Sequence, residues 1–195
     1  ILVGTQILTK GFDFGGVTTV GILNADNLLT MPDFRASERA FQLMMQVAGR
    51  AGRRNDRGRV VIQTSQPTHP VIRFVATGDY HGMANSELAE RKAFGYPPYS
   101  HLIRILLRHE DYNLLRHASH ALAEVMRKKF GERVMGPVSA ALEMLRGEHR
   151  AEIILKIEVG ASMQRARTLL GEAIKTVETD TRYKTVKIAV DVDAL

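Results

Sequence analysis

The chain contains no cysteine, and this absence limits both its chemistry and its location. It excludes disulfide bonds and thiolate metal sites within these residues, and it fits a reducing compartment. No segment approaches the roughly 18 consecutive apolar residues of a membrane span, and no pattern resembles a secretory signal peptide. We therefore expect a cytoplasmic protein that does not insert into membranes.

The residues that are present indicate a folded protein with an anionic partner. Hydrophobic residues make up 45% and charged residues 25% of the chain, which is ordinary for a globular protein. The net charge of +6 and the isoelectric point of about 9.8 favour nucleic acid over a membrane surface as the partner. The first residues, "ILVGT", read like a buried strand, so we expect an upstream part that is missing here.

The stretch "GYPPYS", residues 95–100, predicts a boundary between two domains, 1–95 and 96–195. Two adjacent prolines remove two backbone donors and keep the preceding residue out of helical geometry, so a helix before them must end. The first domain alternates strand-like runs with helical patterns, at residues 1–3, 17–23, 37–50, 60–62 and 79–94. This alternation is typical of parallel βα units. The predicted core faces are Ala40, Met44 and Val47 in the first helix and Tyr80, Ala84 and Leu88 in the second.

The second domain shows six patterns with clear periods. Period-two alternation predicts strands, and spacing near 3.6 residues predicts helices. In chain order these are strand 101–108, helix 112–130, irregular strand 134–145, strand 153–159, helix 166–177 and strand 186–192. The order βαββαβ predicts a ferredoxin-like α+β domain, in which both helices cover one face of a four-stranded antiparallel sheet and leave the other face open.

The stretch "QVAGRAGR", residues 46–53, carries two arginines three positions apart. On a helix, Arg50 and Arg53 would lie about 5 to 6 Å apart at Cβ, so both guanidinium groups could face one anion. Glycine before each arginine would allow close backbone approach, and the pair suits an arginine finger acting on a phosphoryl group. The alternative is a basic helix end that interacts with its own macrodipole, followed by a solvated loop.

Three stretches of the sequence resemble the second motor lobe of superfamily 2 helicases. "GTQILTKGFDF", residues 4–14, matches motif V, "QVAGRAGR" matches motif VI, and "PDFRASER" leads into motif VI. Together with "YPPY", "RGEHRAEIILK" and "VKIAVDVD", they extend the resemblance to the end of the chain. It is most specific for the bacterial primosomal replication-restart DNA helicases, the PriA family. The resemblance implies an α/β fold, with part of a RecA-like lobe followed by the ferredoxin-like domain.

The resemblance also implies a nucleotide site shared with another lobe. Arg50 and Arg53 would reach the γ-phosphate of ATP, bound with Mg²⁺ mainly to that other lobe. Gln46 would couple the nucleotide to the lobe interface, and Gly11 and Asp13 would lie near its ribose and phosphates. From the residues alone, Asp13 equally fits a turn and Gln46 a solvated helix position.

Contacts to the tracked DNA strand are implied for motif V. Thr5 and Gln6 would touch its phosphates, with Lys10 beside them; Thr5 equally fits a helix cap, and Lys10 an exposed loop. The sequence contains no G-x-x-x-x-G-K-[ST] phosphate loop and no Asp-Glu pair after an apolar strand. We therefore expect that the chain alone does not hydrolyse ATP.

Strand parity predicts a basic open face on the second domain. If the aliphatic residues at 103, 105 and 107 face the helices, the alternate residues face away from them. That face would carry Arg104, Arg108, Lys156 and Lys187, partly offset by Glu158 and Asp191. It has no aromatic ladder, which favours contacts to DNA phosphates over base stacking. A solvated sheet with mixed charges is the alternative.

The stretch "RGEHR", residues 146–150, is predicted to be a loop between two strands. Arg146 and Arg150 would make it a phosphate-binding hairpin, although turn composition alone also explains it. No histidines show metal-ligand spacing, and His117 with His120 reads as a helix surface pair. The resemblance places the zinc-binding cysteines of the family in a segment outside this chain, so we expect no metal site here.

The partners implied by the resemblance are branched and single-stranded DNA, single-strand-binding protein and primosome proteins. The implied protein is a nucleoid-associated, ATP-dependent helicase that restarts replication. Two alternatives remain open. One is another superfamily 2 translocase, such as a fork-reversal helicase. The other is a non-catalytic adaptor, in which a degenerate motor lobe carries a nucleic-acid- or protein-binding module.

Overall fold

The computed structural model describes residues 3–4, 17–31, 33–51 and 58–193. The chain divides into two compact units, Ile1–Glu90 and Arg91–Leu195, which we call the N-terminal and C-terminal units. Residues 1–2 of the predicted strand at 1–3 lie outside the described residues, and Val3 is exposed and in no strand. The motif V residues Thr5, Gln6, Lys10, Gly11 and Asp13 also lie outside the described residues.

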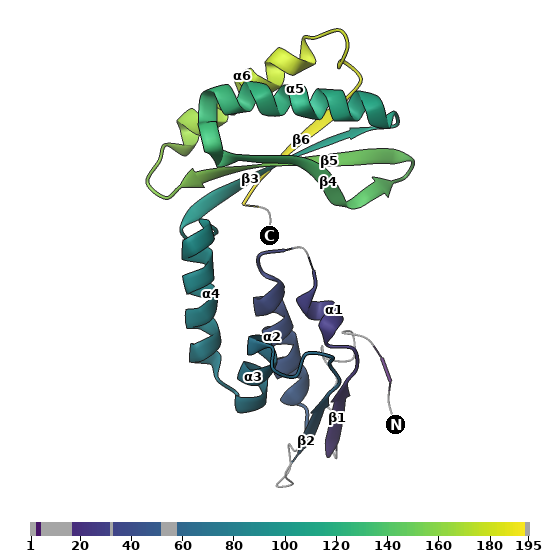
Figure 1. Cartoon of the computed structure of the whole chain (residues 1–195), viewed down its shortest axis with the longest axis vertical. Coiled ribbons are helices and arrows are strands. Elements are labelled where there is room, and N and C mark those ends of the chain that lie inside the picture. Colours follow the sequence, from purple (N-terminus) through teal and green to yellow (C-terminus); the bar gives the residue numbers. More distant parts are fainter. Residues whose placement is uncertain (1–2, 5–16, 32, 52–57, 194–195) are drawn as a thin grey trace. The chain divides into compact units, whose positions relative to one another are not determined.

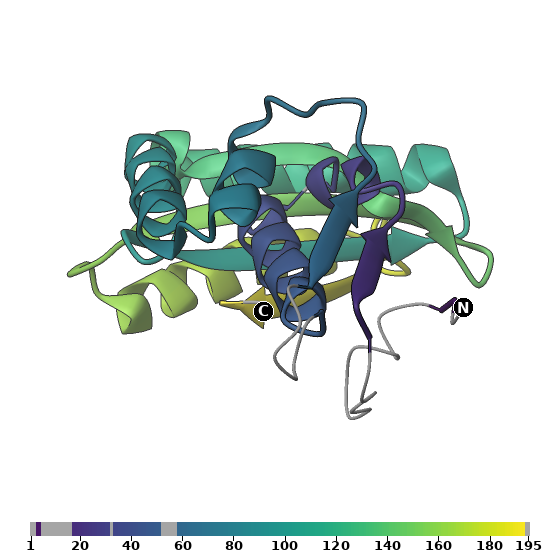
Figure 2. The same ribbon diagram turned by 90° about the horizontal axis from the view of Figure 1, so that it is seen from below.

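Within its described residues, the N-terminal unit contains two short parallel strands. Its elements are β1 (Thr19–Ile22), α1 (Asp26–Leu29), α2 (Ala36–Ala48), β2 (Arg59–Ile62), α3 (Pro70–Thr77) and α4 (Tyr80–Phe94), the last of which continues into the C-terminal unit. β1 and β2 lie side by side, and α2 packs beside β1 (Figures 1 and 2). This confirms the predicted parallel pairing of the runs at 17–23 and 60–62.

One face of α2 forms much of the core of this unit. Ala40 and Met44 are buried as predicted, with Phe41 between them, whereas Val47 is only half-buried. The predicted core face of α4 was wrong: Met83 is buried, while Tyr80 is 63% and Leu88 40% exposed. The apolar residues of α4 are spread around the helix, so their spacing did not select the buried side.

Two helices of this unit were missed by the sequence analysis, for different reasons. α1 has only four residues, too few to show a helical period. α3 follows the loop-like stretch "QPTHP", but it begins with Pro70 in its first turn, where the missing N–H costs nothing. The His69 side chain accepts a hydrogen bond from the backbone N–H of Val71 (3.3 Å) and caps the helix. α3 ends at Gly78, whose φ of 67° suits glycine.

The C-terminal unit has the predicted element order. Its elements are β3 (Ser100–His109), α5 (Tyr112–Phe130), the 3₁₀ turn η2 (Gly131–Arg133), β4 (Val134–Leu145), β5 (Glu148–Glu158), α6 (Met163–Glu178) and β6 (Lys187–Val192). The strands form one antiparallel sheet in the order β4-β5-β3-β6. α5 and α6 cover the same face of this sheet and run in opposite directions (Figure 1).

The core of the C-terminal unit lies between the sheet and these two helices. Ile103, Ile105 and Leu107 are fully buried against helix residues such as Leu122, which confirms the predicted parity of β3. α5 begins at Asp111, whose carboxylate accepts hydrogen bonds from the backbone N–H groups of the next turn. These bonds hold the pKa of Asp111 below its ordinary value.

β4 is irregular where the sequence predicted it. The register shifts between Met135 and Val138, and Gly136 between them has a φ of 94°. A Cβ atom at Gly136 would lie 2.8 Å from the carbonyl oxygen of Glu152 on β5. Glycine therefore permits both the bulge and the close approach of the neighbouring strand.

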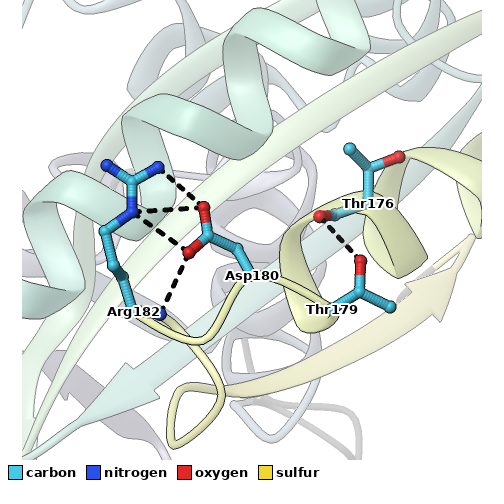
Figure 3. Close-up of polar contacts among 4 residues, drawn as sticks. All are labelled: Thr176, Thr179, Asp180 and Arg182. Carbon is cyan, nitrogen blue, oxygen red and sulfur yellow. Dashed lines mark hydrogen bonds and ion pairs between the residues drawn. The ribbon is translucent and has the colours of Figure 1, made fainter.

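A hydrogen-bonded turn connects α6 to β6 (Figure 3). The Thr179 hydroxyl donates to the carbonyl of Thr176 (3.2 Å), which closes the helix end. The Asp180 carboxylate accepts from the backbone N–H of Arg182 (3.0 Å) and pairs with its guanidinium at 2.7 Å. These contacts lower the pKa of Asp180 to about 2.

Candidate nucleic-acid and nucleotide interface

The helix that carries the predicted nucleotide contacts ends earlier than the sequence predicted. α2 stops at Ala48, and the backbone N–H of Gly49 closes it by donating to the carbonyl of Met45 (3.0 Å). Gln46 is exposed in the last turn, and Arg50 lies in the turn that follows the helix. The prediction that Arg50 lies on a helical face was therefore wrong, because the glycines of this stretch weaken helix propensity. Arg53 lies outside the described residues.

The glycine before Arg50 has no steric role in the described part of the chain. Its φ of −65° is an ordinary helical value. A Cβ atom there would meet the carbonyl oxygens of Met45 and Gln46 at 3.5 and 3.7 Å, which is normal contact. Neither backbone conformation nor local packing therefore explains why glycine stands at position 49.

An acidic residue that sequence analysis missed joins the two loops after the parallel strands. Asp26 follows β1, and its carboxylate accepts hydrogen bonds from the Thr64 hydroxyl (2.5 Å) and from the N–H and hydroxyl of Ser65 (2.9 and 2.8 Å). These bonds lower the pKa of Asp26, and the bond from Thr64 has the largest effect. Ligands of open α/β sheets bind at the carboxyl ends of the strands, and Asp26 fixes the backbone at that edge. The sequence gives no signal for this contact, because only the parallel pairing of β1 and β2 brings Asp26 close to Thr64 and Ser65.

The open face of the C-terminal sheet carries the cations that strand parity predicted. Arg104 and Arg108 on β3 lie on the side opposite the buried aliphatic residues. Register places Lys187 of β6 and Arg150 of β5 on either side of Arg108. Three positive side chains thus stand in one row across three strands.

The same face also carries more carboxylates than the sequence analysis counted. Arg104 lies between Asp191 (3.6 Å) and Glu152 (4.0 Å). Glu148 reaches across β3 to pair with Lys187 at 2.6 Å and lies 3.9 Å from Arg108. The hydrogen bond from Lys187 lowers the pKa of Glu148.

The charges of the open face are more numerous than the sequence analysis counted. The strands of this face carry four carboxylates and five cations: Glu148, Glu152, Glu158 and Asp191, and Arg104, Arg108, Arg150, Lys156 and Lys187. Sequence analysis had counted two of these carboxylates. One more cation, Arg133 just before β4, pairs with Glu158 at 2.8 Å, so most charges of this face are paired.

Lys156 uses its ammonium group within the C-terminal unit. Its Nζ atom donates a hydrogen bond to the carbonyl oxygen of Phe94 (2.7 Å), at the end of α4. The same atom lies 3.9 Å from the centre of the Tyr96 ring, a cation–π geometry. Partial burial lowers the pKa of Lys156. This lysine ties the "YPPY" segment to the sheet.

The loop predicted at 146–150 is shorter than expected. Only Arg146 and Gly147 form the turn, with φ of 54° and 81°, the positive values of a two-residue type I′ hairpin. Glu148 already pairs with Leu145, so the rest of the stretch belongs to β5. Arg146 is exposed at the tip of the hairpin. The His149 ring packs edge-on against the Tyr112 ring, with 5.4 Å between the ring centres.

Within residues 3–4, 17–31, 33–51 and 58–193, no three His, Asp or Glu side chains gather closely enough to hold a metal ion. No helix of that same part of the chain is both long and apolar enough to span a bilayer.

Comparison with known proteins identifies the family of the C-terminal unit. The family model described as the primosomal protein N C-terminal domain matches residues 92–195, the sheet and both its helices. The chain belongs to this family. The PriA resemblance found in the sequence is thereby confirmed.

Relatives of this family match the N-terminal unit as well. The replication restart protein PriA of Bacillus subtilis is 33% identical over 195 residues, which is 99% of this chain and 24% of the relative. That of Treponema pallidum is 40% identical over 175 residues (88% and 27%), and that of Thermotoga maritima 37% over 186 residues (93% and 25%). The chain spans about a quarter of the length of these PriA relatives.

Proposed function

We propose that this chain works as the C-terminal part of an ATP-dependent DNA helicase that recognises branched replication forks and restarts replication by primosome assembly. The observation that carries the proposal is the 33% identity to a replication restart protein across 99% of the chain. The similarity covers both units, so it includes the motor motifs as well as the matched family domain. Single-strand-binding protein and primosome proteins are the proposed partners, in the cytoplasm at the nucleoid.

Both units support a finer assignment of the fold. The parallel pair β1-β2 with α2 beside it is compatible with part of a RecA-like lobe. In the C-terminal unit, the sheet order β4-β5-β3-β6 with two helices on one face is compatible with a ferredoxin-like domain. We propose these two folds for the two units.

The nucleotide role falls on the residues around the end of α2. Gln46 and Arg50 lie at the same end of this helix, one in its last turn and one just beyond it, which suits contact with a phosphate held by another lobe. In the proposal Arg50 and Arg53 stabilise the charge of the γ-phosphate, and Mg²⁺ with ATP supplies the transferable phosphoryl group. Gly11 and Asp13 border that nucleotide.

DNA contacts are proposed for both units. Thr5, Gln6 and Lys10 of motif V touch the phosphates of the tracked strand. In the C-terminal unit, Arg146 at the hairpin tip and Arg150 beside it are candidates for contacts with the DNA backbone.

The test uses the full-length protein and its ATPase activity in the presence of forked DNA. Arg50→Ala and Arg53→Ala should each lower turnover by about 10³-fold or more, because an arginine finger contributes about 10³ to 10⁵ in rate. Arg73→Ala, on the exposed side of α3, is the matched control and should keep full activity. A full-length protein without DNA-stimulated ATPase would support the adaptor alternative, and unwinding without fork preference would support another superfamily 2 translocase.

A further inference from the structure

The positive charge of the C-terminal unit is concentrated on its helices. α5 and α6 together carry seven Lys and Arg residues and three Glu residues. The open sheet face carries five cations and four carboxylates, most of them paired with one another. The helical layer, on the opposite side of the sheet, therefore holds the larger surplus (Figure 1).

Most cations of this layer have no partner within the described part of the chain. Lys129 pairs with Glu172 at 2.6 Å, and Arg127 donates to the carbonyl of Gly136. The side chains of the others are exposed and form no ion pair or hydrogen bond with any described residue: Arg116, Lys128, Arg165, Arg167 and Lys175. We call these five residues the helix face; they spread over the helical layer, and Arg165 and Arg167, two positions apart on either side of the buried Ala166, project from opposite flanks of α6.

Helix stability does not account for the arginines near the start of α6. Arg165 lies in the first turn, where Ser162 is the cap and no acidic residue is present. Positive charge at a helix N-terminus opposes the macrodipole, an unfavourable effect of about 0.3 to 1 kcal/mol. Two residues further on, Arg167 has no carboxylate one helical turn later, because the residue four positions after it is Gly171. An external anion would compensate both charges.

The composition of the surface indicates which anion fits. Protein interfaces combine charges with exposed apolar anchors. Among the described residues, the large exposed apolar side chains of this unit lie mainly on its strands, and on α5 and α6 Tyr112 is the one such residue, at the start of α5. The helix face thus offers charge without apolar anchors, which suits a phosphate backbone and contributes no base recognition.

We propose that the helix face, rather than the open sheet face, is the main surface by which the C-terminal unit binds the phosphate backbone of DNA. From Arg116 to Lys128 the α5 part spans about 18 Å at 1.5 Å per residue, enough to follow several phosphates. The inference rests on the proposed function for the identity of the polyanion. It goes beyond that function by naming the surface and its lack of sequence preference.

The test measures binding of the 195-residue chain to short fluorescent duplex DNA by anisotropy over a series of salt concentrations. Arg165→Gln/Arg167→Gln should weaken binding by about tenfold or more at low salt and reduce the salt slope by about 2. Arg104→Gln/Lys187→Gln removes the same charge from the sheet face, and Arg59→Gln/Arg73→Gln removes it from the N-terminal unit. Both of these pairs should bind almost as the parent chain does, and circular dichroism confirms that each variant is folded.

Each result has a defined meaning. Loss of affinity in the sheet-face pair alone, or equal loss in all three pairs, overturns the inference. So does an Arg165→Gln/Arg167→Gln variant that binds DNA normally but loses affinity for polyglutamate, since the helix face would then fit an acidic protein. A parent chain that binds no DNA at low salt also overturns it. The proposed function is tested separately, because it fails if the full-length protein lacks DNA-stimulated ATPase or unwinds DNA without fork preference.

Discussion

Replacing Lys156 by methionine should destabilise the C-terminal unit. The substitution keeps the length and the apolar stem of the side chain but removes the ammonium group. It thereby deletes the hydrogen bond to the carbonyl of Phe94 (2.7 Å) and the cation–π contact with Tyr96 (3.9 Å to the ring centre). The carbonyl of Phe94, at the end of α4, loses a partner that also neutralises the negative end of the helix.

The size of the effect follows from these two contacts. A hydrogen bond from a charged donor contributes about 1.5 to 3 kcal/mol, and an exposed cation–π contact about 0.5 to 1 kcal/mol. Because the side chain remains partly open to solvent, screening reduces both values, and we expect a net loss of about 1 to 2 kcal/mol. For a unit of this size, each kcal/mol lowers the melting temperature by about 4 to 8 °C.

The assay is urea unfolding of the 195-residue chain followed by far-UV circular dichroism. Lys184→Met is the matched control: Lys184 is exposed, and its side chain forms no hydrogen bond or ion pair with a described residue, so its effect should stay within about 0.5 kcal/mol. If Lys156→Met unfolds at the same urea concentration as the parent chain, the tie to α4 is energetically irrelevant. Unchanged stability combined with weaker DNA binding would instead return Lys156 to a DNA contact.

Three further outcomes concern single positions of the C-terminal unit. Asp111→Ala should lower the urea midpoint of unfolding through loss of the α5 cap, and Asp111→Asn should lower it distinctly less, since asparagine also caps; equal losses would exclude capping as the cause. Asp180 has a folded pKa lowered to about 2 from 3.8, so its stabilising contribution is present above the unfolded pKa and is lost as the pH falls towards 2. The melting temperatures of the parent chain and Asp180→Asn should therefore converge in acid, and a constant difference down to the folded pKa would contradict this. Gly136→Ala should destabilise the chain by more than about 1 kcal/mol because of its positive φ and the 2.8 Å contact, whereas Gly171→Ala, with nothing within 4 Å, should stabilise α6 by up to about 1 kcal/mol; a Gly136 variant as stable as the parent chain would refute the steric argument.

The sequence predicted the C-terminal unit well because its elements are long and each buries one face. The limits of α5 match the predicted 112–130, and β3 departs from its prediction by one residue at each end. The N-terminal unit was harder to predict. α1 is too short to show a period, α3 begins in a proline-rich stretch, and the single buried contact of α4 at Met83 leaves no pattern.

The candidate sites were predictable only as far as strand parity reaches. Parity placed Arg104 and Arg108 on the open face, since alternation alone decides it. It could not reveal that Glu148 pairs with Lys187, a residue 39 positions away on a strand that is not its neighbour. Nor could it show that Lys156 meets a backbone carbonyl 62 positions earlier, because a carbonyl is present at every residue and leaves no signal in the sequence.

The net charge of +6 cannot by itself locate a binding surface, because strands and helices treat their charges differently. In the sheet, register sets each side chain beside residues from neighbouring strands, and Arg104 thereby gains two carboxylates. In α6, the residue four positions after Arg165 is apolar and the one four positions after Arg167 is glycine, so neither arginine finds a local carboxylate there. Arg104, Arg108 and Lys187, which strand parity predicted on the open face, are thus the cations that lie beside carboxylates in the fold. Those on the helices remain available to a polyanion.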